Sequence, residues 1–165
     1  MSNRAISNPV PESSLGTGLY ALAHVATTTF AALTDGNNGS PLTQSSKPLG
    51  SKIPDDIKWN ICHLSNGKYT ISNYLYPNDA TVTSSPRQGD VVKGRHDQHQ
   101  WIIKPHKVNG LPDGQYLISP ADNELVYWTF SDPKQSPVKV EHFCVELTDS
   151  SPGTLWKVIP VPDET

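Results

Sequence analysis

The stretch "GKYTISN", Gly67 to Asn73, has two counterparts in the chain, and this repetition decides the fold. The counterparts are "GLYALAH", which begins at Gly18, and "GQYLISP", which begins at Gly114. The tyrosines of the three stretches are Tyr20, Tyr69 and Tyr116, separated by 49 and 47 residues. A period of this length predicts an architecture built from repeated units of a few secondary-structure elements each.

Each repeat also closes on a tryptophan that is followed two residues later by an aliphatic side chain. The three segments are "KWNI" with Trp59, "QWII" with Trp101 and "LWKV" with Trp156. The span between tyrosine and tryptophan leaves room for about four strands of ordinary length with their turns. The spacing therefore predicts three units of four strands, arranged around a threefold axis.

Residue types along the chain favour an all-β protein. Short segments rich in aromatic and β-branched residues, such as "KYTISNYL" and "LVYWTF", alternate with turn clusters such as "TDGNNGSP". The expected strands are 19–25, 28–34, 58–64, 68–75, 79–84, 100–105, 115–120, 125–130, 137–143 and 155–161. Residues 1–16 hold little that could be buried, so we expect a flexible N-terminal arm followed by one domain over 17–165.

Charge and hydropathy exclude several classes of partner. The net charge is −3, from 13 Lys and Arg against 16 Asp and Glu, and no run of like charge occurs. This composition predicts neither a nucleic-acid surface nor a membrane anchor. The N-terminus lacks the apolar core of a signal peptide, so a cytoplasmic protein is expected. Cys62 and Cys144 stand in apolar contexts typical of buried, reduced thiols.

With three Gly-x-Tyr stretches and three closing tryptophans, the chain resembles a β-trefoil. That resemblance implies twelve strands in three four-stranded repeats, with six strands in a barrel and six in hairpins that cap one end. The repeated tyrosines and tryptophans would then form layers of a shared core rather than a ligand surface. Function is expected on the loops that the barrel displays.

Among trefoil proteins, the ricin-B-like lectins end each unit with Gln-x-Trp. The corresponding triplets here are "IKW", "HQW" and "TLW", none of which has Gln two residues before Trp. Such lectins place an acidic side chain, which accepts hydrogen bonds from sugar hydroxyls, beside an aromatic platform. Asp35 and Asp122 with Tyr127 or Trp128 loosely imitate the arrangement, with Asp122 as the acidic candidate retained, and a carbohydrate-binding trefoil is the alternative prediction.

The main prediction comes from a second resemblance, to the mycocypins and their serine-protease-inhibiting relatives in mushroom fruiting bodies. "GLYAL" at 18–22 and "LWKVIP" at 155–160 match the first and last strands of these small intracellular trefoil inhibitors. The resemblance implies that rigid loops block a protease cleft without chemistry. The loops that block papain-like enzymes map to 24–28 and to 46–56, which includes Lys52 and Pro54.

Other loops of such inhibitors present a single side chain to the protease. The resemblance implies Asn78, with Asn73 as the second choice, for an asparaginyl endopeptidase. Asn37 and Asn38 in "DGNNGS" could serve the same enzyme class, and the alternative is an ordinary turn. Lys93 and Arg95, expected in a turn of the segment 92–100, are the candidates for a trypsin-like target.

Catalysis is not expected. The densest group of titratable side chains is His96, Asp97, His99 and His106, and its spacing defines neither a metal site nor a catalytic triad. We therefore predict no catalytic residue, no metal and no cofactor. The sequence leaves two interpretations, with a target protease as the partner in the first and glycans in the second.

Overall fold

The computed structural model describes residues 15–46, 52–130, 144–149 and 153–162. The expected strand 137–143 and residues 1–14 of the expected N-terminal arm lie outside these ranges, as do residues 47–51 of the loop 46–56. Within the described residues, one short 3₁₀ turn, η1 (Asp55–Ile57), is the single helical element. No described helix has the length and apolar character that a membrane crossing needs. The all-β prediction is confirmed.

The described strands fall into three groups of four along the chain. The first repeat holds β1 (Gly18–His24), β2 (Thr29–Ala32), β4 (Thr43–Ser45) and β5 (Lys58–His63). The second holds β6 (Tyr69–Asn73), β7 (Asp79–Thr81), β8 (Lys93–Arg95) and β9 (Trp101–Val108). The third holds β10 (Leu111–Pro120), β11 (Tyr127–Phe130), β12 (Val145–Thr148) and β13 (Trp156–Pro160). A two-residue strand, β3 (Ser40–Pro41), pairs with β8.

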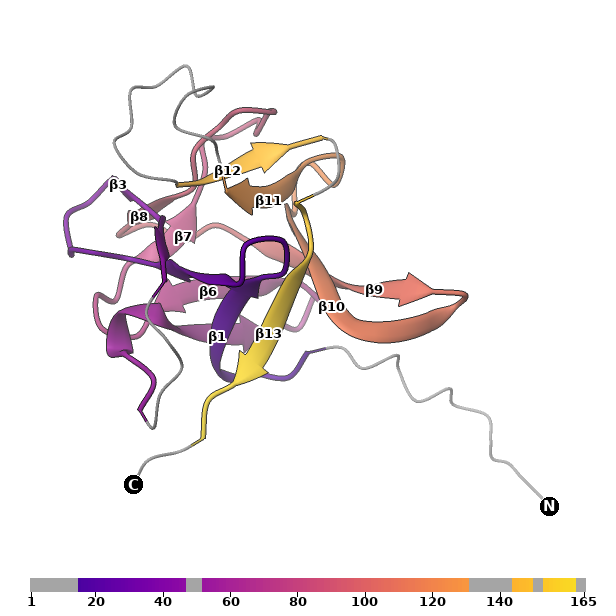
Figure 1. Cartoon of the computed structure of the whole chain (residues 1–165). Coiled ribbons are helices and arrows are strands. Elements are labelled where there is room, and N and C mark those ends of the chain that lie inside the picture. The colour runs from indigo at the N-terminus through magenta and orange to yellow at the C-terminus, as the bar shows by residue number, and fades with distance from the viewer. Residues whose placement is uncertain (1–14, 47–51, 131–143, 150–152, 163–165) are drawn as a thin grey trace.

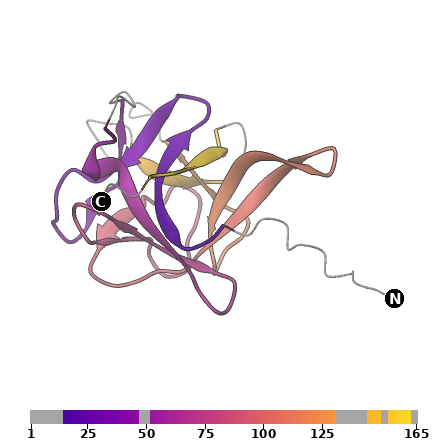
Figure 2. The same ribbon diagram turned by 90° about the horizontal axis from the view of Figure 1, so that it is seen from below.

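The first and last strands of the repeats close into a six-stranded barrel. Antiparallel pairing runs from β1 to β5, β6, β9, β10 and β13, and β13 pairs again with β1. Closure removes the exposed sheet edges that an open sheet would leave. The β9–β10 hairpin is longer than the others and projects from the barrel in both views (Figure 1 and Figure 2).

The second and third strands of each repeat form hairpins, and a ring of backbone hydrogen bonds ties the three hairpins together. The amide of Leu42 donates to the carbonyl oxygen of Val92 at 3.0 Å, Val92 donates to Val145 at 2.8 Å, and Val145 donates to Leu42 at 2.9 Å. All three side chains are fully buried. One residue from each repeat thus marks the threefold axis at the capped end.

The three closing tryptophans repeat one contact. Their indole N–H groups donate to backbone carbonyl oxygens of the second strand in the same repeat, from Trp59 to Ala31 at 2.9 Å, Trp101 to Ala80 at 2.9 Å and Trp156 to Trp128 at 3.0 Å. All three are fully buried, as predicted. Because a buried indole N–H needs a partner, the recurring bond fixes the second strand against the barrel in every repeat.

Each repeated tyrosine stands directly across from a closing tryptophan on the neighbouring barrel strand, and Tyr116 alone of the three is only half-buried. Tyr20 and Tyr69 are buried, and their hydroxyl groups donate to the carbonyl oxygens of Gly16 at 2.7 Å and Leu15 at 2.8 Å. The Leu15 side chain also belongs to the core. The packed domain therefore already includes Leu15, two residues before the expected start at residue 17, because two tyrosine hydroxyls bind the backbone that leads into β1.

The two cysteines differ in environment. Cys144 is buried as predicted, whereas Cys62 is exposed. The expectation for Cys62 was wrong because side chains alternate across a strand: Ile61 points into the core from β5 and its neighbour points out.

Strand β8 depends on a glycine that packs against the core. A Cβ atom on Gly94 would lie 2.9 Å from Cδ2 of Leu33, which is fully buried. We expect Gly94→Ala to lower the free energy of unfolding by about 1–2 kcal/mol through overpacking. Urea denaturation measures this change, with Gly16→Ala as the control because its added Cβ meets nothing within 4 Å. Equal stability of the two variants would contradict the assignment.

Asp79 on β7 is a source of pH-dependent stability. Burial, and secondarily the charge of Asp97, raise the pKa of Asp79 to about 6 from its ordinary 3.8. Its Oδ2 is buried without a hydrogen-bond partner among the described residues. Since the pKa is higher in the folded state than in the unfolded state, ionisation of Asp79 lowers the free energy of unfolding. This loss is absent below about pH 3.8, grows up to about pH 6 and is complete above that pH.

Asp79→Asn is therefore expected to raise the free energy of unfolding at pH 8 by about 1 kcal/mol, after allowance for the solvent that screens a half-buried group. The gain should shrink as the pH falls below 6 and be absent near pH 3.8. Thermal unfolding of both proteins across this range tests the expectation. A difference that does not vary with pH would show that ionisation of Asp79 is not its cause.

Candidate functional site

The two asparagines proposed for an asparaginyl endopeptidase face the interior. Asn78 is 4% exposed, and its side-chain nitrogen donates to the carbonyl oxygen of Gly36 at 3.1 Å. Asn73 is 1% exposed; its nitrogen donates to the carbonyl oxygen of Asp56 at 3.0 Å, and its oxygen accepts a bond from the amide of Leu75 at 3.0 Å. Both side chains hold loops together, and neither is presented to a protease.

Asn37 and Asn38 are exposed, within a tightly bonded turn. The Asp35 carboxylate accepts hydrogen bonds from the Ser40 hydroxyl at 2.6 Å and the Asn37 amide at 2.9 Å, which together lower the pKa of Asp35. The side-chain oxygen of Asn38 accepts a bond from the amide of His96 at 3.0 Å. These contacts fix the turn, and the side chain of Asn38 is already hydrogen-bonded within it.

The remaining inhibitor candidates occupy two different places. Lys52 is exposed and Pro54 is half-buried at the start of η1. Lys93 and Arg95 were expected in a turn, and that expectation was wrong: both belong to β8, which pairs with β7 on one side and β3 on the other. The short strand escaped recognition because "KGR" has no apolar alternation. Both edges of β8 are occupied, so this strand cannot pair with a strand of another chain.

Trp128, one of the two proposed sugar-stacking aromatics, is a core residue. It is fully buried, with ring centroids 5.2 Å from Trp101 and 6.0 Å from Trp156, both edge to face. Ala31 and Ala80 occupy the same position in the other repeats, as the recurring indole contacts show. The expectation that Trp128 could present a platform was wrong, because the period of two in β11 turns residue 128 inward.

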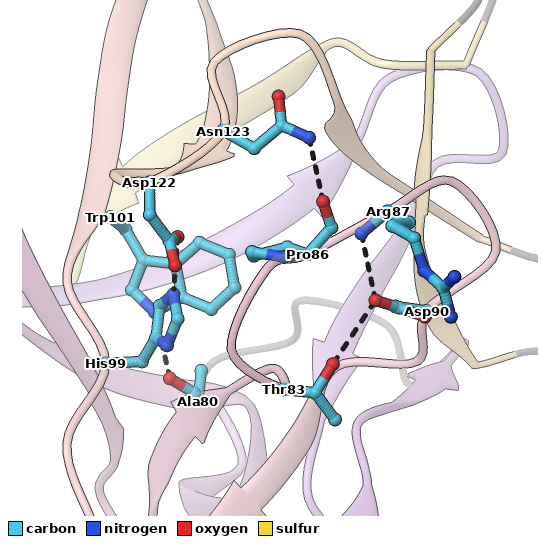
Figure 3. Close-up of polar contacts among 9 residues, drawn as sticks. All are labelled: Ala80, Thr83, Pro86, Arg87, Asp90, His99, Trp101, Asp122 and Asn123. Atoms are coloured by element: carbon cyan, nitrogen blue, oxygen red, sulfur yellow. Dashed lines mark hydrogen bonds and ion pairs between the residues drawn. The ribbon is translucent and has the colours of Figure 1, made fainter.

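Asp122 and Tyr127, the other two members of the proposed sugar site, line different hollows. Asp122 borders a hollow of about 310 Å³ with Lys68, Gln98 and Gln100. One of its oxygens lies 3.3 Å from Nε2 of His99, as Figure 3 shows. Among the described residues no three His, Cys, Asp or Glu side chains are close enough to hold a metal ion.

Tyr127 lines a larger hollow of about 550 Å³, which we call the tyrosine hollow. Its other principal lining residues are His106, Leu117, Asp149, Thr154 and Leu155. They come from β9, β10, the end of β12 and the segment that enters β13, so the hollow belongs mainly to the third repeat. It combines a phenol ring, an imidazole, two aliphatic side chains, a carboxylate and the Thr154 hydroxyl.

Two hydrogen-bonded pairs fix the polar groups around the tyrosine hollow. With its amide nitrogen turned toward Asp149, Gln88 donates to both carboxylate oxygens at 2.8 and 2.9 Å. His106 Nδ1 lies 2.7 Å from the Asp113 carboxylate, and this bond lowers the pKa of Asp113. Asp149 is exposed and retains acceptor capacity, because a carboxylate offers about four acceptor positions.

A buried histidine supports the hollow from behind. His24 is 3% exposed, and its Nε2 donates to the carbonyl oxygen of Gly153 at 2.7 Å while Nδ1 accepts from the Thr27 hydroxyl at 2.8 Å. Burial lowers the pKa of His24 and so favours the neutral imidazole, whereas the bond to Gly153 acts in the opposite direction with the smaller effect. Gly153 has a φ of +98° and adjoins Thr154 of the lining. The turn before β13 is thereby held in place.

Sequence reasoning found Tyr127 but missed Asp149, Thr154 and His106 as its neighbours. These residues lie between 21 and 27 positions away along the chain. Pairing of β11 with β12 sets Thr148, next to Asp149, across from Tyr127, and adjacent strands β9, β10 and β13 carry His106 and the approach to Thr154. No local motif joins them, so a correct strand order was the signal that could have brought them together.

Comparison with known proteins finds structures with the same fold but no relative by sequence. No protein-family model matches the chain, and no curated protein is significantly similar in sequence. Among solved structures, the Rhizoctonia solani agglutinin has a TM-score of 0.68 at 20% identity and covers 96% of this chain and 100% of its own. The Macrolepiota procera ricin B-like lectin, solved with lactose, has a TM-score of 0.68 at 14% identity, over 89% of this chain and 98% of its own.

A designed threefold-symmetric protein, ThreeFoil, has a TM-score of 0.68 at 16% identity and covers 87% of this chain and 99% of its own. At sequence identities this low, the likeness is evidence for a shared fold alone. Together with the closed barrel, the three four-stranded repeats and the ring of hydrogen bonds around the axis, these likenesses show that the chain is a β-trefoil.

Proposed function

We propose that the chain binds carbohydrate without catalysis and that the tyrosine hollow receives one sugar unit. The observation that carries this proposal is the combination of Tyr127, the Asp149 carboxylate and an aliphatic wall in one open hollow. A pyranose ring has an apolar face of C–H groups and a rim of hydroxyl groups, so it needs both kinds of contact. Ligand hollows in general combine an apolar lining with a few polar groups that set orientation.

Each lining group has a distinct part in the proposed complex. Asp149 accepts hydrogen bonds from two neighbouring sugar hydroxyls, and Gln88 holds the carboxylate in place. Leu117 and Leu155 cover the apolar face, and Tyr127 offers both a ring and a hydroxyl. Because the polar groups are fixed before binding, little conformational entropy is lost when the sugar docks.

The structural neighbours support a glycan partner. One is named an agglutinin and another is a ricin B-like lectin solved with lactose. These names describe those proteins, and at 20% and 14% identity they contribute the fold and a class of partner to the proposal. Protease inhibition, the first interpretation from sequence, has less support, because Asn73 and Asn78 face inward and Lys93 and Arg95 belong to a doubly paired strand.

A glycan array probed with labelled protein tests the proposal, alongside titrations of papain, an asparaginyl endopeptidase and trypsin. The expected result is binding to at least one class of neutral glycan, displaced by the free sugar, with all three proteases fully active. An empty array together with stoichiometric loss of one protease activity would overturn the proposal and restore the inhibitor interpretation.

A further inference from the structure

A second hollow lies at the capped end, between the first and second repeats. Its volume is about 420 Å³, and we call it the basic hollow because Lys93 and Arg95 line it. The walls come from β3 on one side and from the β7–β8 hairpin on the other, two elements that β8 joins by pairing with both. No part of the tyrosine hollow contributes to it.

The two cations point into the hollow from one face of β8. Lys93 and Arg95 are separated by Gly94, which is buried against Leu33, and side chains two positions apart on a strand share a face about 7 Å from each other. Among the described residues, neither cation forms an ion pair. Asp79 stands opposite Arg95 in the β7–β8 ladder, yet no ion pair joins them.

One carboxylate lines the hollow, and it is already engaged. Oδ2 of Asp90 accepts hydrogen bonds from the Arg87 amide at 2.9 Å and from the Thr83 hydroxyl at 3.3 Å (Figure 3). Asn123, from the third repeat, donates to the carbonyl oxygen of Pro86 at 2.8 Å and anchors the loop that carries these groups. Two cations therefore face one carboxylate, and the hollow carries a net positive charge in a chain whose net charge is −3.

Besides Thr81 and Thr83, the remaining side chains that line the basic hollow are apolar. They belong to Pro41, Val82 and Val91, from β3, the end of β7 and the segment before β8. Ion-pair geometry alone would suit any small anion, whereas an apolar wall beside two cations suits an anion attached to a ring with C–H groups. The second oxygen of Asp90 remains able to accept a hydroxyl.

We infer that the basic hollow is a second subsite, for a sugar that carries a negative charge, either a carboxylate or a sulfate. This inference rests on the proposed carbohydrate-binding function and adds the ligand class. Arg95 would hold the anionic group by paired hydrogen bonds, Lys93 would add a second charge, and the ring would lie on Pro41 and Val82.

Titration calorimetry with three monosaccharides tests the inference: methyl glucuronide, N-acetylglucosamine 6-sulfate and neutral methyl glucoside. At least one of the two anionic sugars is expected to bind about tenfold more tightly than methyl glucoside, as one charge-assisted hydrogen bond provides. Which of the two binds tells a carboxylate ligand from a sulfate ligand. Raising the salt concentration should weaken the binding.

The variant Lys93→Gln/Arg95→Gln should lose this preference, and Lys104→Gln, an exposed lysine of β9, should keep it. Thermal unfolding of the double variant and of Lys104→Gln at the wild-type temperature would show that both are folded. Arg95→Lys should retain part of the affinity for the anionic sugar. The inference is overturned if neither anionic sugar binds better than methyl glucoside, or if the double variant binds them equally well. If neutral glycans still bind the wild type in that case, the proposed function stands; if no sugar binds, both fail.

Discussion

Trp128→Ala is expected to lower the free energy of unfolding by about 3–5 kcal/mol, the largest loss that we predict for a single substitution. Trp128 is fully buried and packs edge to face against two of the closing tryptophans. Removal of its indole leaves a cavity at a position where the other two repeats have alanine. The neighbouring rings of Trp101 and Trp156 are themselves fully buried and hydrogen-bonded through their indole N–H groups, so they cannot move freely into the gap.

Urea denaturation followed by circular dichroism measures this loss, and two further variants separate packing from other effects. Trp128→Phe should cost clearly less, since it retains an aromatic ring and removes an indole N–H that is buried without a partner in the described part of the chain. Tyr127→Ala, next to it on β11 but half-buried, should cost about 1 kcal/mol. A fully stable Trp128→Ala protein that has lost glycan binding would show that Trp128 contacts the ligand instead.

Tyr127→Ala is expected to weaken binding of a neutral glycan by about thirtyfold, which corresponds to about 2 kcal/mol. The variant loses the phenol ring of the tyrosine hollow, on which the sugar would stack, together with its hydroxyl. Asp149→Asn should weaken binding by about tenfold, because an amide makes weaker hydrogen bonds with hydroxyl groups than a carboxylate does. Calorimetric titration with the best neutral glycan from the array measures both.

Tyr74→Ala is the matched control for the tyrosine variant. Tyr74 is 49% exposed, lies in the second repeat and takes no part in the tyrosine hollow, so its loss should leave the affinity unchanged. If Tyr74→Ala and Tyr127→Ala weaken binding equally, the sugar does not occupy the tyrosine hollow.

Much of the fold could be predicted from the sequence because the repeat is carried by large residues with strict packing needs. Tyr20, Tyr69 and the three closing tryptophans recur at regular intervals, and the structure buries all of them. The third strand of each repeat was missed: β4 reads "TQS", β8 reads "KGR" and β12 reads "VELT". Such short strands are held by pairing with other hairpins rather than by their own residue pattern.

The site residues were harder to predict because turn chemistry is ambiguous. An asparagine in a turn either faces solvent or bonds with nearby backbone groups, and both arrangements suit the same sequence. Asn73 and Asn78 both bond with backbone carbonyl oxygens of other loops. Trp128 poses a similar problem, since a lone aromatic residue in a strand fits either a platform or a core. Its burial follows from its inward position on β11 and from its packing against Trp101 and Trp156, residues that are distant in the sequence.

Chemical-shift mapping on isotopically labelled protein tests the central claim most directly, that the tyrosine hollow binds a neutral sugar. On titration with the best neutral glycan, we expect the amide resonances of Leu117, Tyr127, Asp149 and Thr154 to shift together and to saturate, while those of Asn37 and Asn38 stay in place. Saturable shifts confined to other surfaces, or no shifts at millimolar sugar, would contradict the account.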